Sequence, residues 1–257
     1  MENKEKIIAI TRPFDRSEEA CEIIKSFKAK PFVAPTLELE MVNSKTLKNL
    51  MDNLNKLDWL IFTSPTSIKS IFNFYPDFKD KLSNKTKIAA IGSKTAEILS
   101  DYGLDIDLIP EDYTSEGLIE SFKKLDIKNK FIGIPRTLDA RLILPVELKK
   151  LGTDVLIAET YKSVLPLDTV RIEILISKIL NDEIDAIIFT SPLTVKNLFK
   201  VSVDDQVDEL INKLSTSVLT VSIGPITHKA LEEFDVYSIY PDKYTVKDML
   251  ELLFETL

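Results

Sequence analysis

Short apolar runs alternate with amphipathic segments along almost the whole chain. Runs such as Ile7–Ile10 are rich in β-branched residues, which favours β-strands. The segment that follows this run has Ala20, Ile23, Ile24 and Phe27 at helical spacing, which favours a helix with one apolar face. Strands and helices that alternate in this way predict an α/β fold, in which helices flank a parallel sheet.

The alternation also gives bounds for the expected elements. Strands are expected at Lys6–Thr11, Lys30–Pro35, Trp59–Thr63, Lys87–Ile91, Ile106–Ile109, Phe131–Ile134, Asp154–Ala158, Ala186–Phe189, Val218–Ile223 and Val236–Ile239. Helices are expected at Ser17–Ala29 and at about 44–55, 65–74, 93–102, 115–124, 139–151, 168–181, 192–200, 225–234 and 245–256. No element is predicted between residues 200 and 218.

Three segments of the chain recur later in similar form. The pairs are Trp59–Pro65 with Ala186–Pro192, Ile88–Ser93 with Thr220–Pro225, and Ala9–Pro13 with Gly133–Arg136. Their members are 127, 132 and 124 residues apart (189 − 62, 224 − 92 and 136 − 12). A repeat this long indicates two similar domains that arose by duplication, and not a solenoid of short repeats.

The order of the repeated segments predicts that one domain is discontinuous. The opening strand–helix–strand matches residues 131–158, and residues 186–257 match 58–124. We therefore expect one α/β domain from residues 1–36 with 165–257, and a continuous one from residues 38–161.

The chain then crosses between the two domains twice, at about 36–40 and 159–166. Both segments are polar and extended, so we expect them to pair as a two-stranded hinge. The predicted fold class is two similar flavodoxin-like parallel-sheet lobes, joined by a hinge that lets them close around a ligand.

Composition and charge narrow the class of protein. One cysteine, Cys21, excludes an internal disulfide and favours a reducing cytoplasm. The net charge of −8 argues against a nucleic-acid partner, and no apolar stretch approaches the ~18 residues that cross a bilayer. The charged start, Met1–Lys6, lacks the apolar core of a signal peptide. We expect a cytoplasmic monomer that binds neither membranes nor nucleic acids.

The sequence lacks the common metal and nucleotide motifs. His228 is the only histidine, so a multi-histidine metal site is excluded, and one cysteine cannot form a thiolate cluster. The six glycines form neither GxGxxG nor a P-loop. No cofactor or metal is therefore expected. His228 itself is expected on the solvated first turns of the helix that follows Gly224.

Hydroxyl side chains recur where the predicted strands end and the next helices begin, which is where open parallel sheets bind ligands. The candidates are Thr63, Ser64, Ser93, Ser115, Thr190, Ser191 and Thr227. Helix capping, which contributes ~1 kcal/mol, explains each of them singly. The same geometry points backbone N–H groups and the positive end of the helix dipole at a ligand, which favours an anion. Both explanations stay open.

Arginines occupy matching positions in the two copies. The chain has only five arginines, and Arg12, Arg16, Arg136 and Arg141 follow equivalent strands. A guanidinium holds a carboxylate or phosphate through two hydrogen bonds. We therefore expect Arg12, Arg136 and Arg141 to bind an anionic ligand. The alternative is pairing within one domain, such as Arg141 with Asp139.

Tyr161 lies on the second crossing segment, in Glu159-Thr160-Tyr161-Lys162. A phenol is protonated at neutral pH, so it would donate a proton or a hydrogen bond and would not act as a base. Tyr161 is thus the candidate catalytic residue. The alternative is an aromatic side chain that covers the hinge.

The order and spacing of these motifs resemble the uroporphyrinogen-III synthase family. The resemblance rests on Thr11-Arg12-Pro13, Phe62-Thr63-Ser64, Ile91-Gly92, Thr114–Leu118, Tyr161 after a strand, Asp185–Pro192 and Ile223–Thr227. It covers almost the whole chain. It implies two α/β lobes joined by a two-stranded ladder, and a lyase (a hydro-lyase) of tetrapyrrole biosynthesis that needs no cofactor.

The resemblance also implies the reaction. The linear tetrapyrrole hydroxymethylbilane would lose water and cyclise with inversion of its last pyrrole ring, giving uroporphyrinogen III, a precursor of haem, sirohaem and corrinoids. The candidate arginines, hydroxyls and backbone amides would hold the substrate's carboxylates, and Tyr161 would assist departure of the hydroxyl. The bilane also cyclises unaided to the uninverted isomer, so conformational control is expected to account for much of the catalysis.

Two other classes of protein share parts of this pattern. A non-catalytic two-lobed binding protein for small carboxylates would have the same hinge and strand-end hydroxyls, although such proteins are often exported. A regulatory module built from flavodoxin-like lobes would more often carry acidic residues at a strand end, where this chain has Thr63-Ser64 and Thr190-Ser191.

Overall fold

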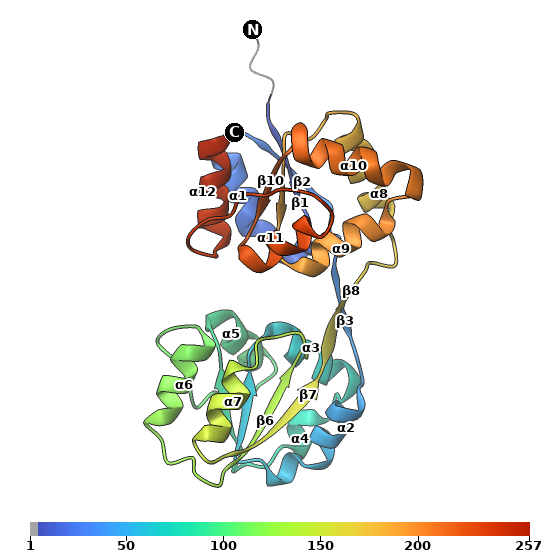
Figure 1. The fold of residues 1–257 in the computed structure, drawn as a ribbon. Helices are drawn as coiled ribbons and strands as arrows, with labels where there is room; N and C mark the ends of the chain where they lie inside the picture. Colours follow the sequence, from blue (N-terminus) through green and yellow to red (C-terminus); the bar gives the residue numbers. More distant parts are fainter. Residues whose placement is uncertain (1–4) are drawn as a thin grey trace. The chain divides into compact units, whose positions relative to one another are not determined.

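The computed structural model describes residues 5–257, which divide into two compact units. Unit 1 comprises the chain up to Glu38 together with Val164–Leu257, and unit 2 comprises Leu39–Ser163. The chain passes between the units along β3 (Glu38–Met41) and β8 (Tyr161–Val164), which pair as a two-stranded sheet (Figure 1). The predicted fold class, α/β with two parallel-sheet lobes, is confirmed.

Unit 1 is a four-stranded parallel sheet in the order β10-β9-β1-β2, with helices on both faces. The helices α1 and α12 cover one face, and α8, α9, α10 and α11 cover the other (Figure 1). Its elements are β1 (Ile7–Ile10), the 3-10 turn η1 (Phe14–Arg16), α1 (Glu18–Ser26), β2 (Lys30–Val33), α8 (Val170–Leu180), β9 (Ala186–Phe189), α9 (Pro192–Val201), α10 (Asp204–Thr216), β10 (Leu219–Ser222), α11 (Pro225–Glu232) and α12 (Val246–Thr256).

Unit 2 repeats this plan with the strand order β5-β4-β6-β7. The helices α6 and α7 cover one face, and α2, α3, α4 and α5 cover the other. Its elements are α2 (Lys45–Asp52), the 3-10 turn η2 (Leu54–Lys56), β4 (Trp59–Phe62), α3 (Pro65–Phe74), α4 (Phe78–Lys81), β5 (Lys87–Ala90), α5 (Ser93–Asp101), α6 (Ser115–Lys123), β6 (Phe131–Arg136), α7 (Ile143–Lys150) and β7 (Asp154–Glu159).

The central strands are buried on both faces, as their unbroken apolar sequences require. In β4, Trp59 and Ile61 pack under α6 and α7, whereas Leu60 and Phe62 pack under the helices of the opposite face. Helices on both faces leave only the ends of the strands open. A ligand site on either sheet is therefore expected at the strand ends.

An aspartate fixes the register of the central strands in both units. Asp58, just before β4, accepts a hydrogen bond from the Phe131 N–H at 2.9 Å and lies 2.9 Å from Lys130 Nζ. The repeat partner Asp185, just before β9, accepts from the Ile7 N–H at 2.8 Å. Burial raises the pKa of Asp58, but the Phe131 hydrogen bond and Lys130 outweigh it and hold the pKa below its usual value.

Asp58→Asn is expected to lower the free energy of unfolding at pH 7 by about 1 kcal/mol, because charged hydrogen bonds are lost and the site is partly exposed. A carboxylate whose pKa is lowered by folding stabilises the fold above its unfolded pKa. That contribution disappears as the pH falls through the folded pKa. In urea unfolding, the difference between variant and parent should therefore shrink below about pH 4. A difference that stays constant down to about pH 3 would contradict this account.

The expected elements differ from the structure at two strands and two helices. Residues 106–109 and 236–239 form only isolated bridges, Ala89 with Leu108 and Val221 with Ile239, so they do not extend the sheets as strands. Pro110 follows the first segment directly, and Pro241 follows the second after Tyr240, and a proline cannot donate to a ladder. The helices α4 and α10 were not predicted, although Phe78 of α4 and Leu210 and Leu214 of α10 are buried.

Candidate active site

The carboxyl edge of the unit 1 sheet gathers the predicted residues of that unit. Arg12 follows β1, Thr190 and Ser191 follow β9, and Thr227 lies in the first turn of α11, after β10. Because β10, β9 and β1 are neighbours and all run parallel, these residues share one edge. The sequence predicted that each of these residues lies at a strand end. The strand order adds that the strand ends are adjacent.

The carboxyl edge of the unit 2 sheet gathers a matching set. Thr63 and Ser64 follow β4, Ser93 begins α5 after β5, and Arg136 ends β6. Tyr161 follows β7, which pairs with β6 along its whole length. A candidate acid, a guanidinium and several hydroxyls therefore share this edge.

The strand-end serines cap helices, as their alternative explanation predicted. Ser64 Oγ accepts from the Thr66 N–H at 3.2 Å, and Ser191 Oγ accepts from the Thr194 N–H at 3.3 Å. Capping uses the hydroxyl as an acceptor, so the O–H remains available to donate to a carboxylate. Gly92 at the start of α5 adopts φ +85°, and no side chain among the described residues caps this helix. Capping and anion binding are thus compatible at this edge.

Arg136 is a buried guanidinium held by backbone carbonyls. It is 4% exposed, its Nε donates to the Thr137 carbonyl at 3.1 Å, and its Nη2 donates to the Arg141 carbonyl at 2.8 Å. Within residues 5–257 no carboxylate forms an ion pair with it. Burial lowers the pKa of Arg136, and the nearby Tyr161 opposes this shift. A buried charge normally has a partner, so this guanidinium is suited to a ligand carboxylate.

Arg12 is the counterpart of Arg136 in unit 1. Its Nη1 is buried and has no hydrogen-bond partner within the described part of the chain. Burial lowers the pKa of Arg12, the charge of Glu19 opposes this, and Arg16 reinforces it. Each unit therefore holds one partly desolvated guanidinium at its carboxyl edge.

Arg141 has a partner inside unit 2. Its Nη1 and Nη2 lie 2.9 and 3.3 Å from the two carboxylate oxygens of Glu116, and the pair is exposed. Ser115, the first residue of α6, precedes Glu116, but the cap of this helix is Thr114, whose Oγ1 accepts from the Gly117 N–H. Arg141 thus contacts the residue that follows Ser115, and it would have to exchange Glu116 for a ligand.

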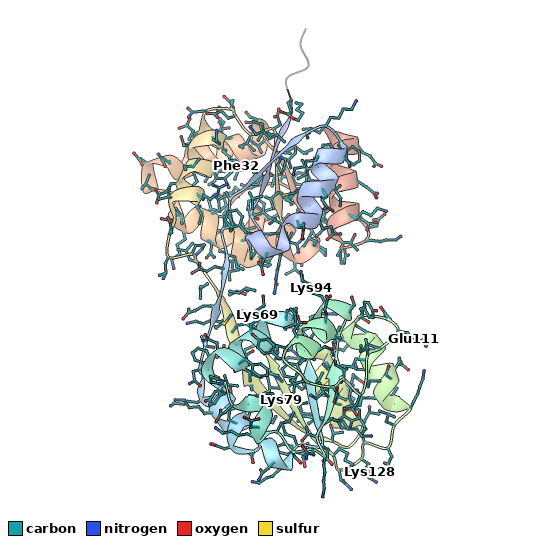
Figure 2. The ribbon with its side chains drawn as sticks, turned by 180° about the vertical axis from the view of Figure 1, so that it is seen from behind. Phe32, Lys69, Lys79, Lys94, Glu111 and Lys128 are labelled. Atoms are coloured by element: carbon teal, nitrogen blue, oxygen red, sulfur yellow. The ribbon has the colours of Figure 1, made fainter. Side chains whose placement is uncertain are left out.

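Arg171 is accounted for by contacts in unit 1. Its Nε donates to the Val33 carbonyl at 3.0 Å, and its guanidinium lies over the rings of Phe14 and Phe32 (Figure 2 labels Phe32). These contacts tie α8 to β2 and to η1. Arg171 is therefore a packing residue and not part of the strand-end set.

Sequence reasoning missed a hydrogen-bonded chain near the carboxyl edge of unit 1. His228 Nδ1 lies 2.9 Å from Ser238 Oγ, which donates to Ser222 Oγ at 3.2 Å. The His228 ring packs against Tyr237 and Tyr240, and its side chain is only 15% exposed. The expectation that His228 lies on a solvated turn is therefore wrong. The segment after α11 folds over the ring, a long-range contact that no local pattern announces.

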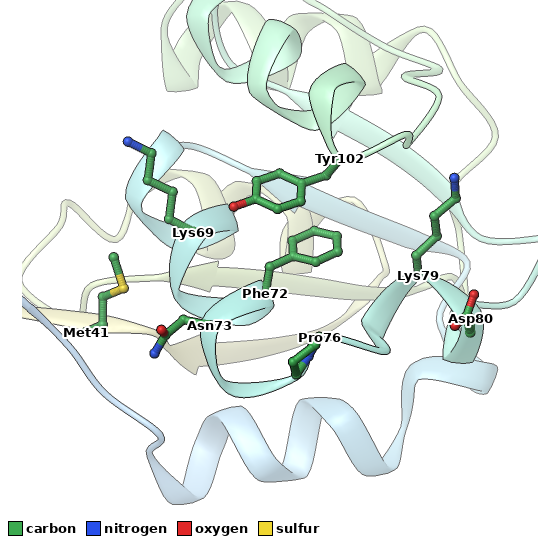
Figure 3. A pocket seen from close by; sticks show the side chains of 8 residues that line it. All are labelled: Met41, Lys69, Phe72, Asn73, Pro76, Lys79, Asp80 and Tyr102. Carbon is green, nitrogen blue, oxygen red and sulfur yellow. The ribbon is translucent and has the colours of Figure 1, made fainter.

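A hollow of about 650 Å³ on the helix layer of unit 2 lies apart from the carboxyl edge. Figure 3 shows the Tyr102 ring over that of Phe72, with centroids 4.0 Å apart, and Lys69 and Lys79 on either side. Its lining residues are Met41, Lys69, Phe72, Asn73, Pro76, Lys79, Asp80 and Tyr102. Its lining residues on α3 belong to the carboxyl-terminal part of this helix, and the others come from β3, α4 and the ends of α3 and α5, whereas Ser64 lies at the amino end of α3. The hollow is thus not part of the strand-end site.

Comparisons with known proteins place the chain in a family. The family model described as "Uroporphyrinogen-III synthase HemD" matches residues 18–251. A putative uroporphyrinogen-III synthase of Methanothermobacter thermautotrophicus is 42% identical over 96% of each chain. The uroporphyrinogen-III synthase of Chlorobaculum parvum is 25% identical over 98% of this chain and 99% of its own.

A solved structure supports the fold. The uroporphyrinogen-III synthetase of Helicobacter pylori, at 19% identity, covers 98% of this chain and 100% of its own, with a TM-score of 0.63. The match of the family model extends over both units, so it does not rest on one of the two repeats alone. This chain belongs to the uroporphyrinogen-III synthase family.

Proposed function

We propose that the chain converts hydroxymethylbilane into uroporphyrinogen III, with loss of water and inversion of the terminal pyrrole ring. The observation that carries the proposal is the carboxyl edge of unit 2. There a buried guanidinium, Arg136, which has no carboxylate partner among residues 5–257, lies near the phenol of Tyr161. The substrate supplies the two things that this arrangement lacks: carboxylates to pair with the guanidinium, and a hydroxyl to accept a proton.

The carboxylates of the substrate are bound at both carboxyl edges. In unit 2, Arg136 pairs with one of them, and Thr63, Ser64 and Ser93 donate hydrogen bonds, together with the uncapped amides of α5. In unit 1 the corresponding groups are Arg12 and the hydroxyls Thr190, Ser191 and Thr227.

Arg141 and Ser115 form a secondary part of the site in unit 2. Arg141 binds a carboxylate after releasing Glu116, with Ser115 beside it at the start of α6. The exchange replaces one exposed ion pair by another, so its net free energy is small. We therefore assign these two residues a smaller share of the binding than Arg136.

Tyr161 is the proposed general acid. Its proton leaves with the substrate hydroxyl as water while the carbon–oxygen bond breaks and the pyrrole nitrogen supplies the electron pair. The terminal ring then uses its substituted carbon to attack the carbon that lost the hydroxyl, which forms a spiro intermediate. The bond from that substituted carbon to the bridge carbon of the neighbouring ring breaks, and the bridge carbon bonds to the free α-carbon of the terminal ring. The proton that this α-carbon loses returns to the Tyr161 phenolate, and the terminal ring is inverted. Tyr161 is 6% exposed, so the proton transfer takes place in a largely water-free environment.

We further propose that the protein acts in the cytoplasm as a monomer, without a cofactor and without a membrane or nucleic-acid partner. A single cysteine and a net charge of −8 support the compartment and the lack of nucleic-acid binding. No helix within residues 5–257 is long and apolar enough to cross a membrane. Light scattering at several protein concentrations tests the monomer, for which the expected mass is 29.2 kDa.

Product isomer analysis tests the reaction. Hydroxymethylbilane is generated in situ, the protein is added, and the oxidised porphyrin isomers are separated by chromatography. We expect isomer III to predominate. If a well-folded sample gave only isomer I at the rate seen without protein, the chain would instead be a binding protein for carboxylates.

A further inference from the structure

The residue before Tyr161 is fixed by three hydrogen bonds. Thr160 is fully buried between β7 and β8, and its N–H donates to the Arg136 carbonyl at 3.1 Å. Its carbonyl accepts from the Val42 N–H at 2.9 Å and from the hydroxyl of Ser70 at 2.5 Å. One of these bonds comes from the last residue of β6 and one from the residue that follows β3, whereas Ser70 comes from the helix α3. The side chain of Ser70 is thus an additional tie on the backbone beside Tyr161.

We propose that Ser70 is a positioning residue for Tyr161, an inference that rests on the proposed function. Ser70 is fully buried, so water does not compete for its hydrogen bond to the Thr160 carbonyl. A peptide plane held at its oxygen has less freedom to rotate, and the Tyr161 side chain projects from the next residue. The tie therefore limits how far the phenol can move relative to Arg136, whose carbonyl receives the Thr160 N–H.

Unit 1 contains the same tie without the tyrosine. Asn197 occupies the position in α9 that Ser70 occupies in α3, six residues after the capping serine (197 − 191 and 70 − 64). Its Nδ2 donates to the Thr36 carbonyl at 2.7 Å. Thr36 lies just before the first crossing strand, as Thr160 lies just before the second, but the next residue there is Leu37. A hydrogen bond of this kind therefore occurs in both units, but only in unit 2 does a tyrosine follow the bonded carbonyl.

A second serine on α3 provides a matched control. Ser67 lies about one turn before Ser70 and is also fully buried, but its hydroxyl has no hydrogen-bond partner within the described residues. Ser67→Ala and Ser70→Ala remove the same atom from the same face of one helix. Only the second change removes the bond to Thr160. Effects of lost volume or helix propensity are therefore common to both variants.

The first experiment compares the steady-state kinetics of these variants with hydroxymethylbilane as substrate. Ser70→Ala is expected to lower kcat about tenfold with KM changed less than about twofold. The activation free energy of the bound substrate would rise by about 1.4 kcal/mol, because the phenol is held less firmly. Ser67→Ala and Asn197→Ala are expected to keep the parent kcat. Ser70→Cys, which fills the site but donates weakly, is expected to fall between parent and Ser70→Ala. A Ser70→Ala kcat equal to that of Ser67→Ala would overturn the proposal.

A double-mutant cycle then asks whether Ser70 acts through Tyr161. In a Tyr161→Phe background, Ser70→Ala is expected to cause no further loss of kcat, because the group that it positions is gone. An equal loss in both backgrounds would refute the proposal and leave the role of Tyr161 intact. Full activity of Tyr161→Phe itself would refute the acid role in the proposed function.

A spectroscopic readout does not depend on activity. The chain has seven tyrosines, and in protein labelled with ring-¹³C tyrosine the Tyr161 signal is the one absent from Tyr161→Phe. Ser70→Ala is expected to shift or broaden this signal, whereas Ser67→Ala and Asn197→Ala leave it in place. A Tyr161 signal that is the same in Ser70→Ala and in the parent would refute the proposal, whatever reaction the protein catalyses.

Discussion

Arg136→Ala is expected to raise the KM for hydroxymethylbilane about 10- to 100-fold, because a hydrogen bond to a charged group contributes about 1.5–3 kcal/mol. Nε and one N–H of Nη2 already hold two backbone carbonyls, so both N–H groups of Nη1 and the second N–H of Nη2 are left to bind the carboxylate. The charge is buried and has no carboxylate partner in the part of the chain that the structure describes, so the proposed substrate supplies one. Steady-state kinetics with hydroxymethylbilane generated in situ measure the change.

Arg136→Lys separates charge from geometry. A lysine keeps the positive charge, but its compact ammonium cannot hold two carbonyls and a carboxylate in the fixed pattern of a guanidinium. Its KM is therefore expected to lie between those of the parent and of Arg136→Ala. Both variants lose the hydrogen bonds to the carbonyls of Thr137 and Arg141, which hold the loop before α7. Their melting temperatures should therefore be modestly lower than that of the parent.

Lys128→Ala is the matched control for Arg136→Ala. Lys128 is an exposed residue before the amino end of β6, whereas Arg136 ends that strand, and both substitutions remove one positive charge (Figure 2). If charge anywhere on unit 2 attracted the substrate, the two variants would show the same rise in KM. The proposed site requires that Lys128→Ala keep the parent KM, and equal effects would contradict a specific role of Arg136.

Much of the fold could be predicted because its determinants are local and repeated. Unbroken apolar runs such as Ala186–Phe189 form central strands, and the order of the two copies indicated which segments share a sheet. The helix α10 escaped prediction because it follows α9 closely, with only Ser202 and Val203 between them. The short runs at 106–109 and 236–239 have the composition of strands, but each forms only one isolated bridge to its sheet.

The residues of the candidate site were also predictable where they depend on local sequence, and not where they depend on distant partners. Strand ends are visible in the sequence, so Arg12, Arg136 and the hydroxyls beside them could be placed at the carboxyl edges. Partners that come from distant parts of the chain could not be predicted. Arg141 pairs with Glu116 and not with Asp139, and the bond of Ser70 spans 90 residues. A serine inside an amphipathic helix carries no local sign that its hydroxyl reaches a neighbouring strand.

Tyr161→Phe is expected to lower kcat about 100-fold with little change in KM, because general acid catalysis contributes about 10²–10⁴-fold and phenylalanine keeps the buried ring. Tyr161 is 6% exposed, so its ring contributes packing that the substitution retains. Since hydroxymethylbilane cyclises unaided to the uninverted isomer, slower catalysis should also raise the fraction of isomer I. Rate and isomer fraction are measured in the same assay, from the porphyrins recovered after oxidation.

Tyr75→Phe removes a phenol hydroxyl from the same unit and serves as the control for Tyr161→Phe. The Tyr75 hydroxyl donates to Asn43 Oδ1 at 2.9 Å, and Tyr75 follows the carboxyl end of α3, away from the strand ends. Its loss is expected to cost about 1 kcal/mol of stability or less, with an unchanged rate. A Tyr161→Phe protein that matched Tyr75→Phe in kcat and in isomer fraction would show that the phenol of Tyr161 transfers no proton. Catalysis would then depend on how the carboxyl edges bind the substrate. Arg136→Ala, through its higher KM, would then lower kcat/KM more than Tyr161→Phe does.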